Sequence, residues 1–401
     1  MLMGRQVEPR YKPGARIPVF DQDREVPSRV KKDLMKTLFP VSPKESLPMP
    51  PPVGHRRSSV VVYGLLIVLL LAVMLLAVSL GSTPIPLVTI AQVIMNGTGL
   101  FHFQPTWDPS VEIIIWQLRM PVVVGAALVG AALAVAGVLF QGLLRNPLAD
   151  PFLIGTSSGA ALGATISFVL PVAALYDTFF PLTAILAFIG ALATVLFVYS
   201  IARVGGRTPV VTLLLAGVVV NSVMVALQTL LLTLFPRNDF SLQSLFNWLS
   251  GGIAVTGWWQ VLLVGLLVLI GLLVASRLTR VLDVFALGEE SAAFLGLHVE
   301  GYKFLLVMLA SLITAAAVSI SGLIGFVGLV TPHVMRLLLG PRHRVLLPAS
   351  ALGGAIFLVI ADLLARTLIA PTVLPVGVFT ALVGAPFFLF LLRRRRREYQ
   401  W

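Results

Sequence analysis

The segment GTSSG at residues 155–159 has the spacing of a hydrolase nucleophile motif, in which a serine between two glycines attacks an ester or amide carbonyl. That chemistry requires a strand before Ser157, a helix after it, and a histidine and an acid as partners. Here a loop interrupted by Pro147 and Pro151 precedes the serine, and a Gly- and Ala-rich apolar run follows it. We therefore rank hydrolysis last among three candidate functions. We interpret Thr156, Ser157 and Ser158 as helix N-caps.

Nucleotide and metal chemistry also lack their signatures. A P-loop would place a lysine between a glycine and a Ser or Thr, but the only lysine after Lys44 is Lys303, and Tyr302 precedes it. The chain has no cysteine, which excludes disulfides, thiolate metal ligands and cysteine nucleophiles, and it has no HExxH motif. We expect no enzymatic activity, no cofactor and no metal site. If ATP energises the protein, a separate subunit must hydrolyse it.

The elements that position these residues are apolar helices. Hydrophobic residues make up 58% of the 401 residues and charged residues only 11%. Runs such as Val60–Leu80 match the ~20 residues that cross a bilayer as a helix, and the strand alternation of a membrane barrel is absent. Since a lipid-exposed backbone must satisfy its own hydrogen bonds, we predict an all-α membrane protein. The expected spans, about ten in number by the length criterion, are 60–80, 119–144, 154–173, 181–203, 209–235, 258–277, 301–322, 324–339, 347–369 and 375–392.

The net charge of +12 indicates topology, and nucleic acid is not needed to explain it. Lys and Arg gather in cytoplasmic loops of membrane proteins. If the N-terminus is inside, only Arg119, Arg237 and Arg366 fall outside. We therefore predict a multi-pass protein of the cell membrane, embedded in the lipid bilayer, with both termini cytoplasmic.

The domain boundaries follow composition. Residues 1–57 hold ten prolines and mixed charge with no apolar period, so we predict a disordered, basic cytoplasmic tail. A later true start at Met49 and a lipid-binding tail are the alternatives. We assign 58–397 to a ten-helix membrane domain and 398–401 to a C-terminal tail. Gly137–Pro147 and Gly322–Pro332 have equal spacing, which fits an inverted repeat, and chance recurrence in Gly-rich apolar sequence explains it equally well.

The segment at 282–301 differs from the spans. Glu289 and Glu290 suit a helix N-terminus, and Gly296 can end the helix. The helix between them is too short to span a bilayer. Its apolar residues predict a docking knob on the cytoplasmic side. The alternative is a helix folded back on its own spans.

Six motifs in order along the chain carry a resemblance. They are RMPVVVGAALVGAALAVAGVLFQGLLRNPLADPFLIGTSSGAALG, LLLAGVVVNSV, ALGEESAAFLGL, SGLIGFVGLVTPHVMR, HRVLLPASALGGAIFLVIADLLAR and LPVGVFTALVGAPFFLFLL. Together they resemble the iron-siderophore, haem and vitamin B12 permease family of ABC importers over residues 60–397. The resemblance implies ten transmembrane helices, a homodimer, two ABC ATPase subunits and an external substrate-binding protein.

The resemblance also implies three sites. The docking knob becomes the ATPase coupling helix, with Glu289, Glu290, Ser291, Ala292, Phe294 and Leu295. Gly217, Asn221 and Gln228 share one face of the fifth span by their spacing, and the resemblance places that span on the translocation path. Contact with a neighbouring helix is the alternative.

Arg119 and Arg366 match positions where a related permease receives glutamates of its binding protein. This chain departs from that pattern at Val122, where a second arginine would stand. The alternatives are an interfacial anchor for Arg119 and an intrahelical pair with Asp362 for Arg366.

We therefore predict the permease subunit of a type II ABC importer that moves a bulky iron chelate, with haem or cobalamin as other candidates, by alternating access. The alternative is an ion-coupled secondary transporter without an ATPase. Such a transporter needs buried carboxylates, and Asp362 is the one clear acid within a span.

Overall fold

The computed structural model describes residues 56–396 except 82, 98, 100–102, 170–181, 236–238 and 371. These residues belong to a unit that begins at Arg56. The tail expected at 1–57, apart from its last two residues, and the C-terminal tail at 398–401 lie outside the described residues. The boundaries of the three predicted regions therefore stay predictions.

The described ranges are helical, contain no strand, and have one isolated bridge between Val204 and Arg207. The α-helices are α2 (Arg56–Ser79), α3 (Leu87–Gly97), α4 (Pro109–Ile113), α5 (Met120–Leu143), α6 (Thr156–Val169), α7 (Leu182–Ala202), α8 (Val210–Leu234), α9 (Asp239–Leu249), α10 (Trp258–Arg277), α11 (Thr279–Phe285), α12 (Glu289–Phe294), α13 (Val299–Ser321), α14 (Val327–Leu339), α15 (His343–Thr367) and α16 (Val376–Arg396). A π-helical segment, η1 (Ile114–Arg119), joins α4 to α5, and a 3-10 helix, η2 (Pro151–Ile154), precedes α6.

The predicted all-α membrane fold is confirmed. Among the described residues, 7 helical segments are long and apolar enough to cross a membrane, and α14 and α16 contribute shorter apolar stretches. Each of the ten expected spans falls on one of these helices or on α6, whose described part has 14 residues. Helices α3 and α9 lie outside the expected spans. The inverted repeat stays a prediction.

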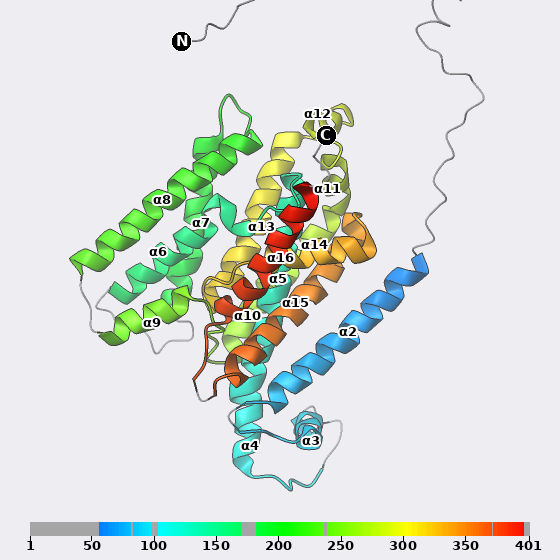
Figure 1. The fold of residues 1–401 in the computed structure, drawn as a ribbon, viewed down its shortest axis with the longest axis vertical. Helices are drawn as coiled ribbons and strands as arrows, with labels where there is room; N and C mark the ends of the chain where they lie inside the picture. Colours follow the sequence, from blue (N-terminus) through cyan, green and yellow to red (C-terminus); the bar gives the residue numbers. More distant parts are fainter. Residues whose placement is uncertain are drawn as a thin grey trace, which may run out of the picture. The chain divides into compact units, whose positions relative to one another are not determined.

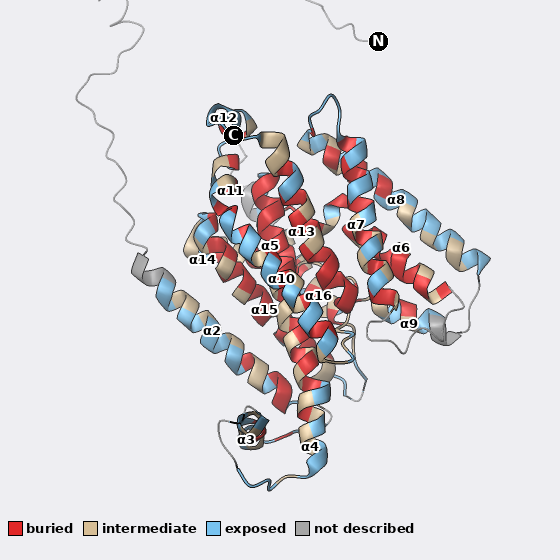
Figure 2. Ribbon diagram, turned by 180° about the vertical axis from the view of Figure 1, so that it is seen from behind, coloured by how far each residue is buried: buried red, intermediate tan, exposed pale blue. Residues whose placement is uncertain are grey.

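Helix α5 lies at the centre of the bundle, packed against α15, α13, α14 and α10. Figure 2 shows α5, α13 and α15 largely buried, while α2 and α8 are exposed along much of their length. Helices α11 and α12 lie at one end of this unit and α3 and α4 at the other (Figure 1). We call these the α12 end and the α4 end.

Glycines set how closely the central helices approach. A Cβ atom at Gly130 of α5 would overlap the carbonyl oxygen of Gly354 in α15, and one at Gly137 would overlap that of Gly328 in α14. On α6, Gly163 meets the backbone of α7 in the same way. The small residues of α6 therefore allow close packing, as the sequence predicted.

Helices α4, η1 and α5 form one continuous helical segment of 35 residues, Pro109–Leu143. The segment widens to π-helix just before Pro121, whose ring has no N–H to donate and would clash with the carbonyl four residues earlier. Arg119 therefore lies inside a long helix. The predicted start of this span at residue 119 was therefore too late, because the helical segment begins at Pro109.

The turn between α5 and α6 is built from two Asx turns. The Asn146 side chain accepts a hydrogen bond from the Leu148 amide, and the Asp150 side chain accepts one from the Phe152 amide. Asn146 and Asp150 each directly precede a proline. The expected N-caps at Thr156 and Ser158 were wrong, because both hydroxyl groups donate to backbone carbonyl oxygens.

We predict that Gly130→Val lowers the stability of the permease by roughly 1–3 kcal/mol or more, because overpacking forces α5 and α15 apart. The matched control is Gly64→Val in α2, where an added Cβ meets nothing within 4 Å. Thermal unfolding of the two purified variants in detergent measures the difference. Equal melting temperatures for the two variants would contradict the proposed close packing.

Candidate functional site

Helix α12 presents its apolar residues outward. Phe294 is 92% exposed and Leu295 is 63% exposed, whereas Ala292 is buried against the bundle. Gly296 ends the helix at positive φ: the Gly296 amide donates to the Ala293 carbonyl and the Leu297 amide to the Ala292 carbonyl. This is the Schellman arrangement that the glycine predicted. Among the six predicted coupling residues, Ala292 is therefore covered by its own chain, and Glu289 pairs with Lys303 of the same chain.

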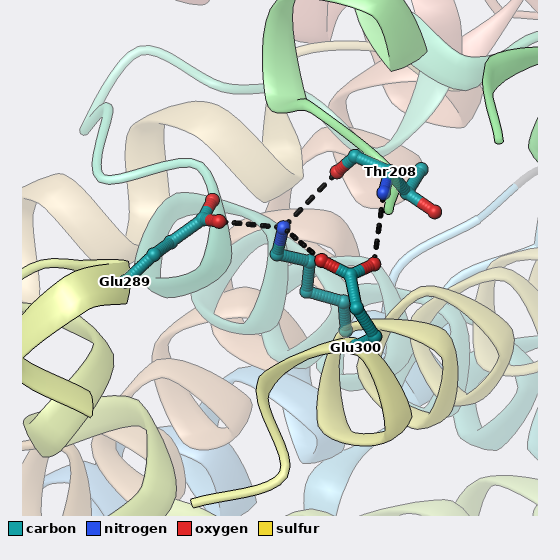
Figure 3. Close-up of polar contacts among 4 residues, drawn as sticks. Thr208, Glu289 and Glu300 are labelled. Atoms are coloured by element: carbon teal, nitrogen blue, oxygen red, sulfur yellow. Dashed lines mark hydrogen bonds and ion pairs between the residues drawn. The ribbon is translucent and has the colours of Figure 1, made fainter. Parts of the chain in front are cut away.

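Lys303, at the start of α13, joins α12 to the segment before α8 (Figure 3). Its ammonium group lies 2.6 Å from a Glu289 carboxylate oxygen and 2.9 Å from one of Glu300, and it donates to the Thr208 carbonyl at 3.1 Å. The other Glu300 oxygen accepts from the Thr208 amide at 2.8 Å. We call these four residues the Lys303 cluster.

Of the three acceptor residues in this cluster, Glu289 was predicted as a coupling residue, whereas no role was predicted for Glu300 or Thr208. A local signal existed for Glu300, because it stands three residues before Lys303 on the same helix, a spacing at which opposite charges pair. Nothing local identifies Thr208, which lies 92 residues from Glu300 along the chain.

Two cavities open at the α12 end. One of about 750 Å3 is lined by charged residues of both signs, Arg145, Arg207, Glu289, Glu290 and Glu300 among them. The other, of about 600 Å3, is lined by Arg145, Asp283, Arg336 and His343 among others. Because Arg145 lines both, the turn after α5 lies between them.

Further polar contacts tie the helices together at this end. The His343 imidazole Nδ1 lies 2.7 Å from an Asp283 carboxylate oxygen, which joins α15 to α11. Arg336 of α14 donates to the Gln141 side chain of α5 at 3.0 Å. In the adjoining turn, burial raises the pKa of the Asp150 carboxyl to about 6, although the hydrogen bond from the Phe152 amide opposes this shift. Among the described residues, no group of His, Asp and Glu could hold a metal ion.

The three predicted path residues of α8 have different surroundings. Gly217 is buried, and a Cβ there would lie 2.5 Å from the Leu153 carbonyl oxygen of η2. The Asn221 side chain is exposed and Gln228 is partly exposed. Of the three residues, Gly217 therefore packs against its own chain, whereas the amides of Asn221 and Gln228 are not covered by it.

Arg119 and Arg366 both have partners within the chain. Arg119 is 7% exposed, and its guanidinium donates to the carbonyl oxygens of Val78, Ser79 and Thr83. It thereby satisfies carbonyl groups at the C-terminus of α2, where a cation is favoured. Arg366 pairs with Asp362 at 2.8 Å, as the alternative interpretation expected, and its side chain is 19% exposed.

The antiparallel packing of α5 and α15 brings these two arginines to one end of the bundle. Gly130 meets Gly354 at the middle of both helices, and Gly142 meets His343 at the α12 end. Arg119 and Arg366 therefore lie toward the α4 end, on the side of the molecule opposite Phe294.

Comparison with known proteins gives a consistent result. The model of the FecCD transport family matches residues 69–394. An uncharacterized ABC transporter permease, YvrB of Bacillus subtilis, is 42% identical over 327 residues, covering 80% of this chain and 90% of that protein. The cobalamin import permease BtuC of Halobacterium salinarum is 42% identical over 79% of this chain and 81% of its own length. The hemin transport permease HmuU of Yersinia pestis is 40% identical over 74% of this chain and 89% of its own length.

A solved structure described as the inward-facing conformation of a candidate metal-chelate type ABC transporter also matches. It has a TM-score of 0.70 and 29% identity, and the match covers 84% of this chain and 99% of the other. The family model and these relatives agree, and the chain belongs to the FecCD transport family of ABC transporter permeases.

Proposed function

We propose that this permease moves a bulky chelate, a ferric siderophore, haem or cobalamin, into the cell by alternating access, driven by ATP hydrolysis in a partner subunit. The observation that carries the proposal is α12, a short helix outside the spans whose Phe294 ring is 92% exposed. Leu295 beside it is 63% exposed, and contiguous apolar surface outside the spans favours contact with another protein. The sequence has no P-loop lysine, so that protein would supply the ATPase.

The charge distribution supports a cytoplasmic location for the α12 end. Arginines gather there, and Lys and Arg are concentrated in cytoplasmic loops. They include Arg145, Arg207, Arg336 and Arg342, which line the two cavities at that end. The α4 end would then face outward, toward an external substrate-binding protein.

The names of the relatives support the substrate class. The matched permeases are named for cobalamin, hemin and iron-hydroxamate import, all of which are large chelates. A secondary transporter is less well supported, because the carboxylate of Asp362 is already paired with Arg366.

The proposal is tested by measuring uptake of each chelate into proteoliposomes that hold permease, ATPase and binding protein. Uptake at the same rate with and without ATP would contradict it.

The part of α8 from Asn221 to Leu234 supports a homodimer with a central path. Its apolar side chains, such as Val223, Leu227 and Leu230, are exposed in the single chain. Asn221 and Gln228 lie among them, and within the described residues neither amide has a hydrogen-bond partner. An amide left unpaired in lipid costs several kcal/mol, roughly 2–7 depending on reference. We therefore place these amides on a water-filled path between two copies of α8.

Replacing Phe294 and Leu295 by Asp should remove the ATPase contact. We expect less than about a tenth of the wild-type ATPase to co-purify, since hot-spot residues in interfaces contribute roughly 2 kcal/mol or more. The control is Val373→Asp, an exposed apolar residue beyond α15 at the α4 end. Normal ATPase recovery with the double variant would show that α12 is not the coupling helix.

Cysteines introduced in this Cys-free chain test the path. We expect Asn221→Cys and Gln228→Cys to react with a membrane-impermeant thiol reagent in at least one nucleotide state of the complex, because the path holds water. The control is Leu266→Cys on the exposed face of α10, which should stay unreactive in lipid. Protection of both α8 positions in every state would eliminate the path interpretation.

We propose that Arg366 contacts the external binding protein. Arg119 instead holds the C-terminus of α2 through hydrogen bonds to its carbonyl groups. The paired variant Asp362→Asn with Arg366→Gln removes the ion pair without leaving a buried charge alone. It should slow capture of the binding protein, because the guanidinium proposed to contact that protein is lost while the net charge of the permease stays the same. ATPase activity without substrate is the control and should persist. Unchanged association rates at low ionic strength would assign Arg366 a purely internal role.

A further inference from the structure

We propose that the Lys303 cluster is a mechanical link that carries movement of α12 to α8. Lys303 acts as a positioning residue: it contacts neither substrate nor ATP and holds two moving elements at a fixed separation. The inference rests on the proposed function, in which α12 receives the ATPase and α8 lines the path. The inference names Lys303 as the residue through which α12 acts on α8.

The ammonium group of Lys303 has three protons, and each has an acceptor on a different segment. Glu289 belongs to α12, Glu300 belongs to α13, and Thr208 precedes α8 (Figure 3). A lysine ammonium has three donors and no acceptor, so these contacts complete its hydrogen bonding. The group is therefore a three-way junction at which α12, α13 and the start of α8 meet.

The junction is tightly connected to α8. Thr208 is bound twice, through its carbonyl to Lys303 and through its amide to Glu300 at 2.8 Å. Only Pro209 separates Thr208 from the first residue of α8, and the ring of Pro209 restricts its φ, which is −62°. A displacement of the junction therefore reaches the first turn of α8 with little flexible chain between.

Burial makes the junction resistant to separation. Lys303 is 4% exposed, and Thr208 is buried as well. Removing one partner from a buried charge costs far more than an exposed ion pair contributes, because the remaining charge is desolvated without compensation. When α12 is pushed or pulled, moving the junction as a unit therefore costs less than breaking it. Glu290, the next residue along α12, is exposed and has no ion pair among the described contacts.

Two acidic residues at the α12 end supply a matched test. Glu289→Ala removes the arm to α12 and leaves Lys303 bound to Glu300 and Thr208. Asp283→Ala removes an equal charge at the same end, where Asp283 contacts His343, but leaves the junction intact. Each variant is assembled with ATPase and binding protein in proteoliposomes, and chelate uptake and ATP hydrolysis are measured together.

We expect Glu289→Ala to lower the chelate moved per ATP about five-fold or more, the lower end of typical coupling between sites. The ATPase should still co-purify and hydrolyse ATP. Asp283→Ala should match the wild type in chelate moved per ATP. Glu300→Ala removes one of the two bonds to Thr208 and should give a smaller loss in the same direction. The Glu289→Ala Glu300→Ala double variant should be no worse than Glu289→Ala, because both substitutions act on one series connection.

The outcomes separate this link from the proposed function. A purely structural role for the cluster would lower melting temperature and yield of the complex while chelate moved per ATP stayed constant, and that result would overturn the link. The same holds if Glu289→Ala and Asp283→Ala move equal amounts of chelate per ATP in a complex whose wild type couples normally. If the wild-type complex itself binds no ATPase or moves no chelate, the proposed function fails, and the link fails with it.

Discussion

The close approach of α15 and α14 to α5 is the constraint on which the rest of this bundle depends. Lipid removes most of the hydrophobic drive between helices, so close contact between backbones must supply the attraction. Glycines at 130, 137 and 354 allow that contact because no side chain separates the helices. With α5 fixed between its neighbours, both of its ends carry groups to defined places: Arg119 to the C-terminus of α2, and Gln141 to Arg336.

The polar contacts divide between the two ends of the bundle. At the α4 end, arginines neutralise groups of their own chain, the terminal carbonyls of α2 and the carboxylate of Asp362. At the α12 end, the buried Lys303 connects separate elements, while Phe294 and Leu295 remain exposed. The charged contacts at the α4 end therefore lie within or beside α2 and α15, whereas Lys303 joins elements that are distant along the chain.

Features with a local physical cause were predictable from the sequence. The span 258–277 coincides with α10, because hydropathy and length alone decide a bilayer crossing. Helix α12 and its end at Gly296 followed from capping rules. Features that depend on distant contacts were not predictable. Gly217 is buried because η2 lies against it, and the Lys303 cluster joins residues 92 positions apart. The helical segment that contains Arg119 begins at Pro109, ahead of the predicted span.

The contact between Gly130 and Gly354 also limits how the family can vary. A side chain at Gly130 would overlap the main-chain oxygen of Gly354, and a side chain at Gly354 would overlap the main-chain oxygen of Gly130. No substitution at one position can make room for a larger residue at the other, since every residue type has the same carbonyl group. Compensating pairs of mutations, common where side chains meet, are therefore unavailable here. Aligned relatives that keep this helix spacing should retain glycine at each position independently, and so show invariance without covariation.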